Sequence, residues 1–393
     1  AGYLLDGADG RTLAVESRMN PQAQYGADVI MRANYALEHG TEALSMCVRK
    51  AVNEMLGSLA EDAGIRREDV FQVCVVGNTC MHHLFLGISP ASLVHAPYTP
   101  AVSERLVLNA GDYGLAVQER AELIMLSDIA GYVGADTCGC LLAIRQDQQE
   151  EISLMIDIGT NGEMVLGNRE RMVTCSTAAG PAFEGAKIEC GMRGAAGAVD
   201  HVKYEDGKWN YTTVGNKPAV GLCGSGLIDL VAGLLDAGML DENGVLRSGQ
   251  EKQGMFILVP PERGGNERGV YLTQKDLGEV QLAKAAIAAG IQMLMERLGI
   301  TEDDICSVYI AGAFGNYMDP VSAGKIGLFP ATLVKKVKPV GNAAGEGAKI
   351  ALVNEKEMLE MDELVRKIEF VELAASADFQ DHFIDELGFE TGE

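Results

Sequence analysis

The sequence predicts an α/β protein built from two related lobes that face a cleft. Apolar runs of strand length alternate with amphipathic helical stretches, a pattern typical of α/β folds. Glycine is enriched, at 47 residues, and the glycines gather where strands are expected to end. The chain also contains an internal repeat, in which residues 64–77 align without gaps on residues 299–312. Each copy has the pattern of a helix end, a short turn, a buried strand and a final glycine, which predicts the same local fold in both lobes.

The first half of the chain is predicted to open with a hairpin, followed by a long helix. Two short apolar runs within residues 3–17 are joined by a turn rich in Asp and Gly, the signature of a β-hairpin. Helical periodicity extends over residues 28–63, with a break expected near Gly40. Residues 71–76 form an apolar run that predicts a buried strand. The residues predicted to share one face of the helix before its break are Ile30, Ala33 and Leu37.

The second half also begins with short predicted strands joined by turns, and strands then alternate with helices. Residues 152–174 contain three short apolar runs separated by glycine turns, which predicts three strands. A helix is expected over residues 226–237, and a longer helix begins near Thr273 and continues to about residue 298. Thr273 and Asp276 have the spacing of a capping box, with Asp in place of Glu. Residues 307–311 predict a further buried strand.

The repeat divides the chain into three predicted parts. Residues 1–150 would form the first lobe, residues 151–342 the second, and residues 343–393 a helical and strand segment that packs back across both. The second lobe starts with a strand at residues 154–158, whereas the matching position in the first lobe falls before Ala1. We therefore expect this sequence to be a piece of a longer protein, lacking the first strand of its first lobe.

The charge of the chain narrows the classes of partner. With 32 Lys and Arg against 56 Asp and Glu, the formal net charge is −24. A field of this sign repels nucleic acids and anionic membrane surfaces, so neither is an expected partner. The sequence has no apolar run of about 18 residues, so no membrane-spanning helix is expected. ATP is compatible with this charge, because backbone N–H groups and Mg²⁺ can hold its phosphates inside an acidic protein.

The nine cysteines indicate a reducing compartment. Their number is odd, most lie in apolar runs, and no C-x-x-C spacing occurs. This usage favours reduced thiols in a cytoplasmic protein. Cys138-Gly139-Cys140 contains the closest pair, so we expect no iron–sulfur cluster held wholly within this chain.

A candidate phosphate-binding loop is the sharpest functional motif. Asp157 lies at the end of a predicted buried strand, and Gly159-Thr160-Asn161-Gly162 follows as a turn that offers backbone N–H groups and a hydroxyl to an anion. The Asp157 carboxylate is placed to hold hydrated Mg²⁺ against the same phosphates. A plain hairpin turn is the alternative, since Asn161-Gly162 by itself favours one. The preceding Asp and the Gly-Thr pair favour phosphate binding.

Several ordered motifs resemble those of a known family. Asp157-Ile158-Gly159-Thr160 resembles a phosphate loop of the acetate and sugar kinase, Hsp70 and actin superfamily, and residues 310–316 resemble its adenosine loop. A narrower resemblance, covering nearly the whole chain, is to the C-terminal domain of the reductive activators of corrinoid proteins. The motifs that carry it are residues 20–22, 25–28, 77–83, 157–163, 179–186, 222–229, 311–315 and 372–379.

This resemblance implies both a fold and an activity. The fold would consist of two actin-like (ribonuclease H-like) lobes around a nucleotide cleft, with mixed sheets flanked by helices. Members of the family use ATP to drive an uphill electron transfer that reduces a Co(II) corrinoid protein to Co(I). The [2Fe-2S] cluster of the family belongs to an upstream ferredoxin domain that is absent from this sequence. By resemblance, this chain would be the ATP-binding and ATP-hydrolysing part, the corrinoid protein its partner, and the assembly a homodimer.

The resemblance also implies roles for individual residues. Asp157 would hold Mg²⁺, and Glu163 would orient water, although an exposed strand residue is an equal alternative for Glu163. Glu184, at a predicted helix start, would contact nucleotide or simply cap the helix. Gly224 and Ser225, at a helix N-terminus, would hold an anion or allow close strand–helix packing. The residues that would bind phosphates are Gly159, Thr160, Asn161 and Gly162, and those that would line the nucleoside are Gly312, Ala313, Phe314 and Gly315.

The sequence is also compatible with three other functions. An activator of 2-hydroxyacyl-CoA dehydratases would need a cluster cysteine where this chain has Thr177, and Cys175 lies two residues too early. A small-molecule kinase would need a catalytic carboxylate for which the first lobe offers no clear candidate. A non-catalytic interaction module with a degenerate nucleotide site is the third. His82-His83 could meet a partner or the corrinoid cobalt, but neighbouring residues point to different sides of most elements, which favours a structural role.

Overall fold

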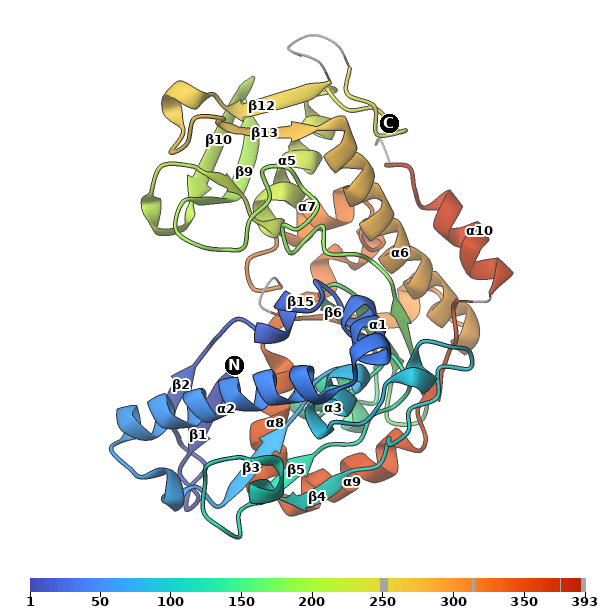
Figure 1. Ribbon diagram of the computed structural model, residues 1–393. Helices are drawn as coiled ribbons and strands as arrows, with labels where there is room; N and C mark the ends of the chain where they lie inside the picture. Colours follow the sequence, from blue (N-terminus) through green and yellow to red (C-terminus); the bar gives the residue numbers. More distant parts are fainter. Residues whose placement is uncertain (248–253, 313–314, 375, 390–393) are drawn as a thin grey trace. The chain divides into compact units, whose positions relative to one another are not determined.

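The computed structural model describes residues 1–247, 254–312, 315–374 and 376–389, and it divides into two compact units (Figure 1). Unit 1 comprises Ala1–Gln149, Arg169–Met172 and Asn342–Phe370, and unit 2 comprises Glu150–Asn168, Val173–Gly341 and Val371–Glu393. The chain is mixed α/β with several mixed sheets, as the sequence predicts at this level. Each helix of the described residues is too short or too polar to span a bilayer.

Unit 1 is built around a small mixed sheet in the order β3-β5-β4, with β3 parallel and β4 antiparallel to β5. Strands β1 and β2 form the predicted hairpin, and helix α2 packs against it. The strands are β1 Gly2–Leu5, β2 Thr12–Glu16, β3 Gln72–Val75, β4 Leu106–Asn109, β5 Glu122–Met125 and β16 Glu369–Phe370. The helices are α1 Val29–His39, α2 Glu42–Ala63, α3 Thr79–Leu86, α4 Ala135–Ile144, α8 Ala343–Val353 and α9 Glu355–Val365.

The predicted long helix is the pair α1 and α2, separated at Gly40. The φ angle of Gly40 is 83°, in the left-handed region that favours glycine. The predicted apolar face of α1 is wrong in part. Ala33 is buried, but Ile30 and Leu37 are 45% and 40% exposed. The face of α1 that packs inward carries Ala33 and Ala36, with Val29 and Tyr35 packed beside them, and Ile30 and Leu37 lie outside this face.

The predicted strand at residues 71–76 is shorter and less buried than expected. Strand β3 begins at Gln72, and all four of its residues are only half-buried. Phe71 lies outside the strand and is 58% exposed. The apolar run therefore marks the edge of a small sheet rather than the centre of a large one.

Helices α4 and α8 of unit 1 cross at a pair of glycines. A Cβ placed on Gly347 would lie 1.8 Å from the carbonyl oxygen of Gly139, and a Cβ on Gly139 would lie 2.6 Å from that of Ala344. No side chain fits at either glycine without moving a helix backbone. This crossing joins α8, from late in the sequence, to the core of unit 1.

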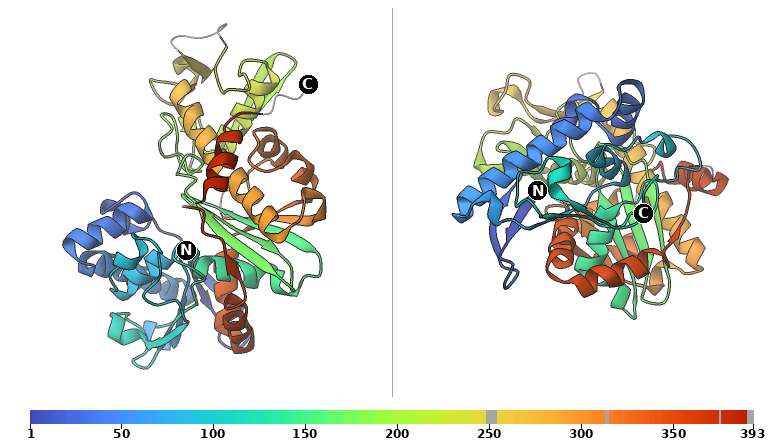
Figure 2. Two further views of the ribbon diagram at one scale, coloured as in Figure 1. Left: turned by 90° about the vertical axis from the view of Figure 1, so that its right-hand side faces the viewer. Right: turned by 60° about the horizontal axis from the view of Figure 1, so that its bottom comes forward.

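Unit 2 is built around a larger mixed sheet (Figure 2). The strands of this sheet that belong to unit 2 follow the order β15-β14-β6-β7-β8. Strand β14 is parallel to both β15 and β6, and β6 is antiparallel to β7. The long helix α6 packs on β7, and helix α5 packs on β9 of a second sheet, β10-β9-β11. The strands are β6 Ile152–Ile158, β7 Gly162–Gly167, β8 Met172–Thr177, β9 Ala198–Glu205, β10 Lys208–Thr213, β11 Gly221–Leu222, β12 Met255–Val259, β13 Val270–Thr273, β14 Ile305–Ala311 and β15 Val337–Gly341. The helices are α5 Gly224–Asp236, α6 Gln274–Leu298, α7 Pro320–Lys325 and α10 Ala377–Asp385.

The local structure of the two repeat copies is the same. Helix α2 ends at Gly64 with a φ angle of 68°, and α6 ends at Gly299 with a φ angle of 70°. A short 3-10 helix follows in each copy, Arg67–Asp69 or Glu302–Asp304, and an Asp at its third position bonds back to the backbone before it. Strand β3 or β14 comes next. The sequence repeat therefore corresponds to one structural motif present in both units.

Candidate functional site

The candidate phosphate loop lies in unit 2, at the end of strand β6. Asp157 is the second-last residue of β6 and is half-buried. Its Cα is paired with that of Ala311 on β14 and with that of Glu163 on β7, so the carboxylate belongs to a strand flanked on both sides. The turn that follows is tight, because the Gly159 N–H donates to the Asn161 carbonyl at 3.0 Å and β7 begins at Gly162.

Gly312, the residue after β14, lies next to the Asp157 carboxylate. Its φ angle is 89°, and a Cβ placed on it would lie 3.0 Å from Asp157 Oδ1. The Gly312 N–H donates to the carbonyl oxygen of Gly341 at 2.9 Å, which holds the backbone in this position. The φ angle therefore favours glycine at position 312, and a Cβ there would press on the Asp157 carboxylate.

Thr160 connects the loop to the segment that follows β8. The Gly180 N–H donates to the Thr160 carbonyl at 2.8 Å, and the Thr160 hydroxyl donates to the Glu184 carboxylate. Glu184 lies in a turn that the Ala186 N–H closes on Pro181 at 3.1 Å. The predicted helix start at this position is wrong, since residues 181–190 form turns whose Phe183 side chain is buried in the core.

Glu163 lies directly across the strand pair from Asp157. Its side chain is half-buried and accepts a hydrogen bond from the Ser176 hydroxyl at 3.4 Å. Asp157 and Glu163 are thus paired residues on neighbouring strands, next to the same turn. A water-orienting role for Glu163 stays a prediction.

Gly315 completes the described part of the candidate adenosine loop. Its N–H donates to the Gly312 carbonyl at 3.2 Å, and a Cβ on it would lie 2.7 Å from Ile310 Cγ2. Gly315 therefore lies close to the end of β14. Ala313 and Phe314, the other two predicted residues of this loop, lie outside the described residues.

Gly224 and Ser225 open helix α5, and the Ser225 hydroxyl contacts β9. The Ser225 side chain is buried, and its hydroxyl donates to the Asp200 carbonyl at 2.8 Å. A Cβ on the next residue, Gly226, would lie 2.2 Å from the Val199 carbonyl oxygen. These contacts explain the glycine-rich sequence by close helix–strand packing, and a role in anion binding stays a prediction.

The geometry around Asp157 fits a magnesium–nucleotide complex. The features that suit phosphate and Mg²⁺ are a carboxylate at a strand end, a turn with backbone N–H groups, and a glycine backbone beside the carboxylate. Asp157 would supply one ligand, and phosphate and water oxygens would complete the shell. Among the described residues, no group of three or more His, Cys, Asp and Glu side chains is placed to hold a metal ion by itself.

The cysteines are free thiols, and most are buried. Burial raises the pKa of Cys74 and of Cys80 to about 12, so these thiols stay protonated near neutral pH. Cys175, the residue nearest to the cluster position of a dehydratase activator, is fully buried, and burial raises its pKa further. At that cluster position itself, the Thr177 hydroxyl donates to the Gly162 carbonyl at 3.3 Å.

His82 and His83 are both buried in α3 of unit 1. The Ala101 N–H donates to His83 Nε2 at 2.9 Å, and His83 Nδ1 lies 2.8 Å from the Thr79 carbonyl oxygen. Burial lowers the pKa of His83, in keeping with a neutral ring that carries its proton on Nδ1. His82 Nδ1 lies 3.3 Å from Oδ1 of the buried Asp128. These contacts give the pair a structural environment within unit 1.

A half-buried carboxylate near this pair is not apparent from the sequence. Asp136 lies in the first turn of α4, and burial raises its pKa to about 6. The neighbouring Asp128 carboxylate adds to the rise, whereas His82 and the Thr137 N–H oppose it. Asp128 in turn accepts the Ala135 N–H at 2.9 Å. Only the order Gly-Ala-Asp-Thr at a helix start could have signalled this cluster.

Comparison with known families identifies the chain. The C-terminal domain of RACo, the ASKHA domain, matches residues 151–393, and the RACo middle region matches residues 1–149. The chain belongs to this family. Its members include corrinoid activators, and this membership favours them over the dehydratase activators and small-molecule kinases considered from the sequence.

Individual relatives agree with this family. The chain is 35% identical over 401 residues to the corrinoid activation enzyme RamQ of Eubacterium limosum, covering 98% of this chain and 67% of RamQ. It is 27% identical over 399 residues to the Co(II) methylated amine-specific corrinoid protein reductase of Methanosarcina barkeri, covering 93% and 71%. A solved structure of a reductive activator for corrinoid, iron–sulfur protein matches with a TM-score of 0.89 at 37% identity, covering 98% of this chain and 64% of the other. The chain thus spans about two thirds of the length of these relatives.

Proposed function

We propose that this chain is the ATP-binding and ATP-hydrolysing part of a reductive activator that couples ATP to the reduction of a Co(II) corrinoid protein to Co(I). The corrinoid activators among its relatives support this proposal. The observation that carries it is local: the Asp157 carboxylate stands at a strand end, beside the turn at residues 159–162 and against the bare backbone of Gly312. The partner would accordingly be a corrinoid protein, with no role for nucleic acid.

The residues of the loop would bind and orient the phosphates of ATP. The backbone N–H groups of residues 160–162 would donate to phosphate oxygens, and Gly159 would let the backbone approach them closely. The Thr160 hydroxyl would donate to a phosphate oxygen after turning away from the Glu184 carboxylate, to which it donates in this structure. Asp157 would hold Mg²⁺, which, when bound, neutralises charge that develops on the transferring phosphoryl group. Glu163 would orient the attacking water. No nucleophilic side chain is needed, because positioning and charge neutralisation account for most of the catalysis of phosphoryl transfer.

The remaining candidate residues would bind the nucleoside of ATP or a further anionic group. The loop at residues 312–315 would line the nucleoside, with the Gly312 and Gly315 backbones allowing close approach. Gly224 and Ser225 would act at the N-terminus of α5, where the first N–H groups of a helix attract an anion.

We also propose an actin-like organisation, with lobes at residues 1–150 and 151–342 and a C-terminal segment at residues 343–393 that packs back across them. The shared motif of helix, left-handed glycine, short 3-10 helix and strand in both units supports two related lobes. In the complete protein we expect a homodimer of cytoplasmic subunits. Its [2Fe-2S] cluster would belong to a separate upstream domain, as in the family that the motifs resemble.

Calorimetric titration with Mg-ADP and Mg-AMPPNP tests the nucleotide site. We expect saturable binding that Asp157→Ala weakens at least about tenfold, the order of one lost contact to a charged group. Asp303→Ala is the matched control, because Asp303 is an exposed carboxylate of the same unit and lies outside the site. Equal binding by the wild type and Asp157→Ala would refute the assignment of Asp157.

Turnover separates an ATPase from a non-catalytic module. We expect ATP hydrolysis by the complete protein in the presence of a corrinoid protein, and we expect Asp157→Ala to abolish it. Saturable binding without any turnover under these conditions would favour the interaction module with a degenerate nucleotide site.

A further inference from the structure

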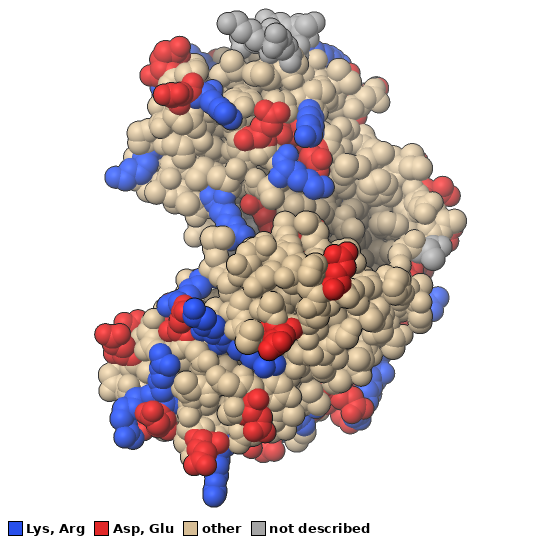
Figure 3. All heavy atoms as spheres, in the orientation of Figure 1, with Lys and Arg blue, Asp and Glu red and all other residues tan. Residues whose placement is uncertain are grey.

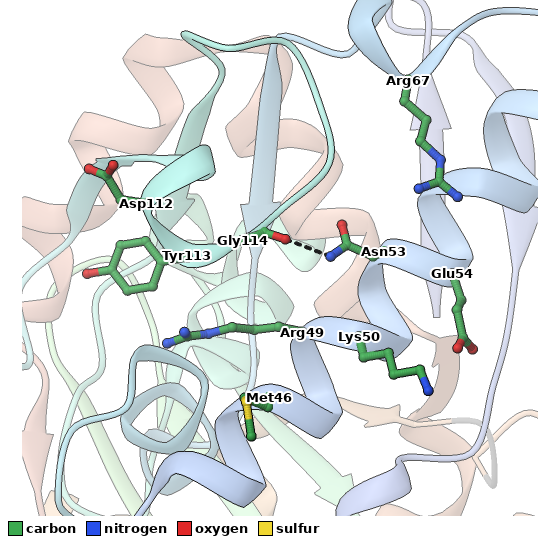
Figure 4. Close-up of a pocket in the computed structure, with 9 residues that line it drawn as sticks. All are labelled: Met46, Arg49, Lys50, Asn53, Glu54, Arg67, Asp112, Tyr113 and Gly114. Atoms are coloured by element: carbon green, nitrogen blue, oxygen red, sulfur yellow. Dashed lines mark hydrogen bonds between the residues drawn. The ribbon is translucent and has the colours of Figure 1, made fainter.

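A groove along helix α2 of unit 1 is distinct from the nucleotide site. It has a volume of about 540 Å³ and lies between α2, the 3-10 helix Ala110–Tyr113 and the 3-10 helix Arg67–Asp69. The Asn53 side chain connects α2 to the end of the 3-10 helix Ala110–Tyr113, because it donates a hydrogen bond to the Gly114 carbonyl at 2.7 Å (Figure 4). The residues that give the groove its character are Met46, Arg49, Lys50, Arg67, Asp112 and Tyr113.

Three cations in this groove have no carboxylate partner within the described residues. Arg49, Lys50 and Arg67 form no ion pair there, although the chain as a whole carries 56 Asp and Glu against 32 Lys and Arg. Other arginines of unit 1 do form ion pairs, among them Arg11, Arg18, Arg66, Arg105, Arg145, Arg171 and Arg366. The neighbouring basic residue in sequence, Arg66, is bound to Asp69 at 2.9 Å. The three groove cations are therefore available to an external anion.

Neither of the two acidic residues of the groove neutralises these three positive charges. Glu54 is already paired with Arg18 at 2.7 Å. In Figure 4, the Asp112 carboxylate points away from Arg49 and Lys50. Figure 3 shows basic side chains interspersed with acidic ones along the surface over α2. The local charge that faces the groove is thus opposite in sign to the net charge of the chain.

Arg49 is held in place and partly desolvated. Its Nε–H donates to the Phe85 carbonyl at 2.7 Å, and its guanidinium lies 5.0 Å from the ring centroid of Tyr113. Burial lowers the pKa of Arg49 from its ordinary value, as expected for a guanidinium removed from water without a carboxylate partner. An anion that binds here would recover this desolvation cost and would find the guanidinium already oriented.

The cations are spread along the groove rather than gathered at one point. In Figure 4, the side chains of Arg49, Lys50 and Arg67 point in different directions, so one phosphate group cannot contact all three. An extended chain with several carboxylates can do so, and the 57% exposed Met46 offers it an apolar contact. We propose that the α2 groove is a docking site for an acidic, extended segment of a protein partner. This proposal does not depend on the nucleotide site, because the residues of that site belong to unit 2.

A labelled peptide tests the proposal directly. The probe is a fluorescein-labelled glutamate-rich peptide, and its binding to the chain is followed by fluorescence anisotropy at low and physiological salt. We expect saturable binding that weakens with salt. Lys50→Gln and Arg67→Gln should each weaken binding about threefold, and Arg49→Gln about tenfold because its contact is partly buried. The same peptide with Gln in place of Glu should not bind.

Arg66→Gln is the matched control, because it removes the same charge one residue from Arg67 but outside the groove. We expect it to leave the affinity unchanged. The proposal is overturned if the peptide does not bind, or if Arg66→Gln weakens binding as much as Lys50→Gln and Arg67→Gln do. Displacement of the peptide by inorganic phosphate, at equal ionic strength to a chloride control, would also overturn it, since the groove would then be a site for small anions. Lys50 is exposed, so Lys50→Gln keeps the test valid even if Arg49→Gln unfolds.

Discussion

Replacement of Asp136 by asparagine should stabilise unit 1 at neutral and higher pH. Asp136 is held in the first turn of α4, next to the buried Asp128, and burial raises its pKa from 3.8 to about 6. A rise of about two pH units corresponds to about 3 kcal/mol, at about 1.4 kcal/mol for each unit. The folded state therefore loses about that much stability when the carboxyl group ionises.

The pH window follows from the sign of this pKa change. The folded state binds the Asp136 proton more tightly than the unfolded state does, so the free energy of unfolding falls as the pH rises from about 4 to about 6, and it stays lowered above that range. The amide of the asparagine variant would not ionise, and its carbonyl oxygen can still accept the Thr137 N–H that Asp136 Oδ1 accepts at 2.9 Å. Asp136→Asn should therefore match the wild type near pH 4 and exceed it by about 3 kcal/mol near pH 8.

Hydrogen exchange measured by mass spectrometry suits this test. The single tryptophan, Trp209, belongs to unit 2, so its fluorescence does not report on unit 1. Exchange of the α4 amides, measured in EX2 conditions across the pH range, reports the opening free energy of unit 1 directly. Asp62→Asn, an exposed carboxylate on α2, serves as the control. The reasoning is refuted if Asp136→Asn lowers stability at pH 8, or if its effect is the same at pH 4 and pH 8.

Three further substitutions have definite expected outcomes. Gly347→Ala should destabilise unit 1 by about 2 kcal/mol, because its Cβ would meet the Gly139 carbonyl oxygen; unchanged hydrogen exchange in α4 and α8 would contradict this. Gly312→Ala should weaken Mg-AMPPNP binding at least about tenfold, as it strains a backbone with a φ angle of 89° and presses on the Asp157 carboxylate; full affinity in calorimetry would contradict it. Lys284 is 2% exposed and its Nζ donates to the Gly388 carbonyl, so Lys284→Ala should cost about 2 kcal/mol in urea denaturation followed by tryptophan fluorescence; an unchanged midpoint would contradict it.

Features that depend on neighbouring residues could be predicted from the sequence. The break at Gly40 and the capping box of Thr273 and Asp276 are set by glycine's access to left-handed φ angles and by hydrogen bonds within one turn. The turn after Asp157 is likewise a local structure. The repeat was visible for the same reason, because each copy ends a helix on a glycine and turns through a short 3-10 helix into a strand.

Features that depend on which elements pack together could not be predicted. Ile30 and Leu37 have helical spacing but are exposed, because α1 packs inward through the face that carries Ala33 and Ala36. The turn at Glu184 replaced a predicted helix start, since its carboxylate meets Thr160 on a distant loop. The raised pKa of Asp136 and the lowered pKa of Arg49 both come mainly from burial within the packed chain.

The sequence by itself thus determined the class of fold, the family and the identity of the candidate nucleotide loops. Those depend on residue types at short spacing, where backbone geometry and local hydrogen bonds decide the outcome. Only the tertiary structure decided that Gly312 lies against Asp157, that Asp136 interacts with the buried Asp128, and that Arg49, Lys50 and Arg67 line one groove without ion pairs among the described residues. The physical reason is that distance and desolvation between remote segments are properties of the packed chain as a whole.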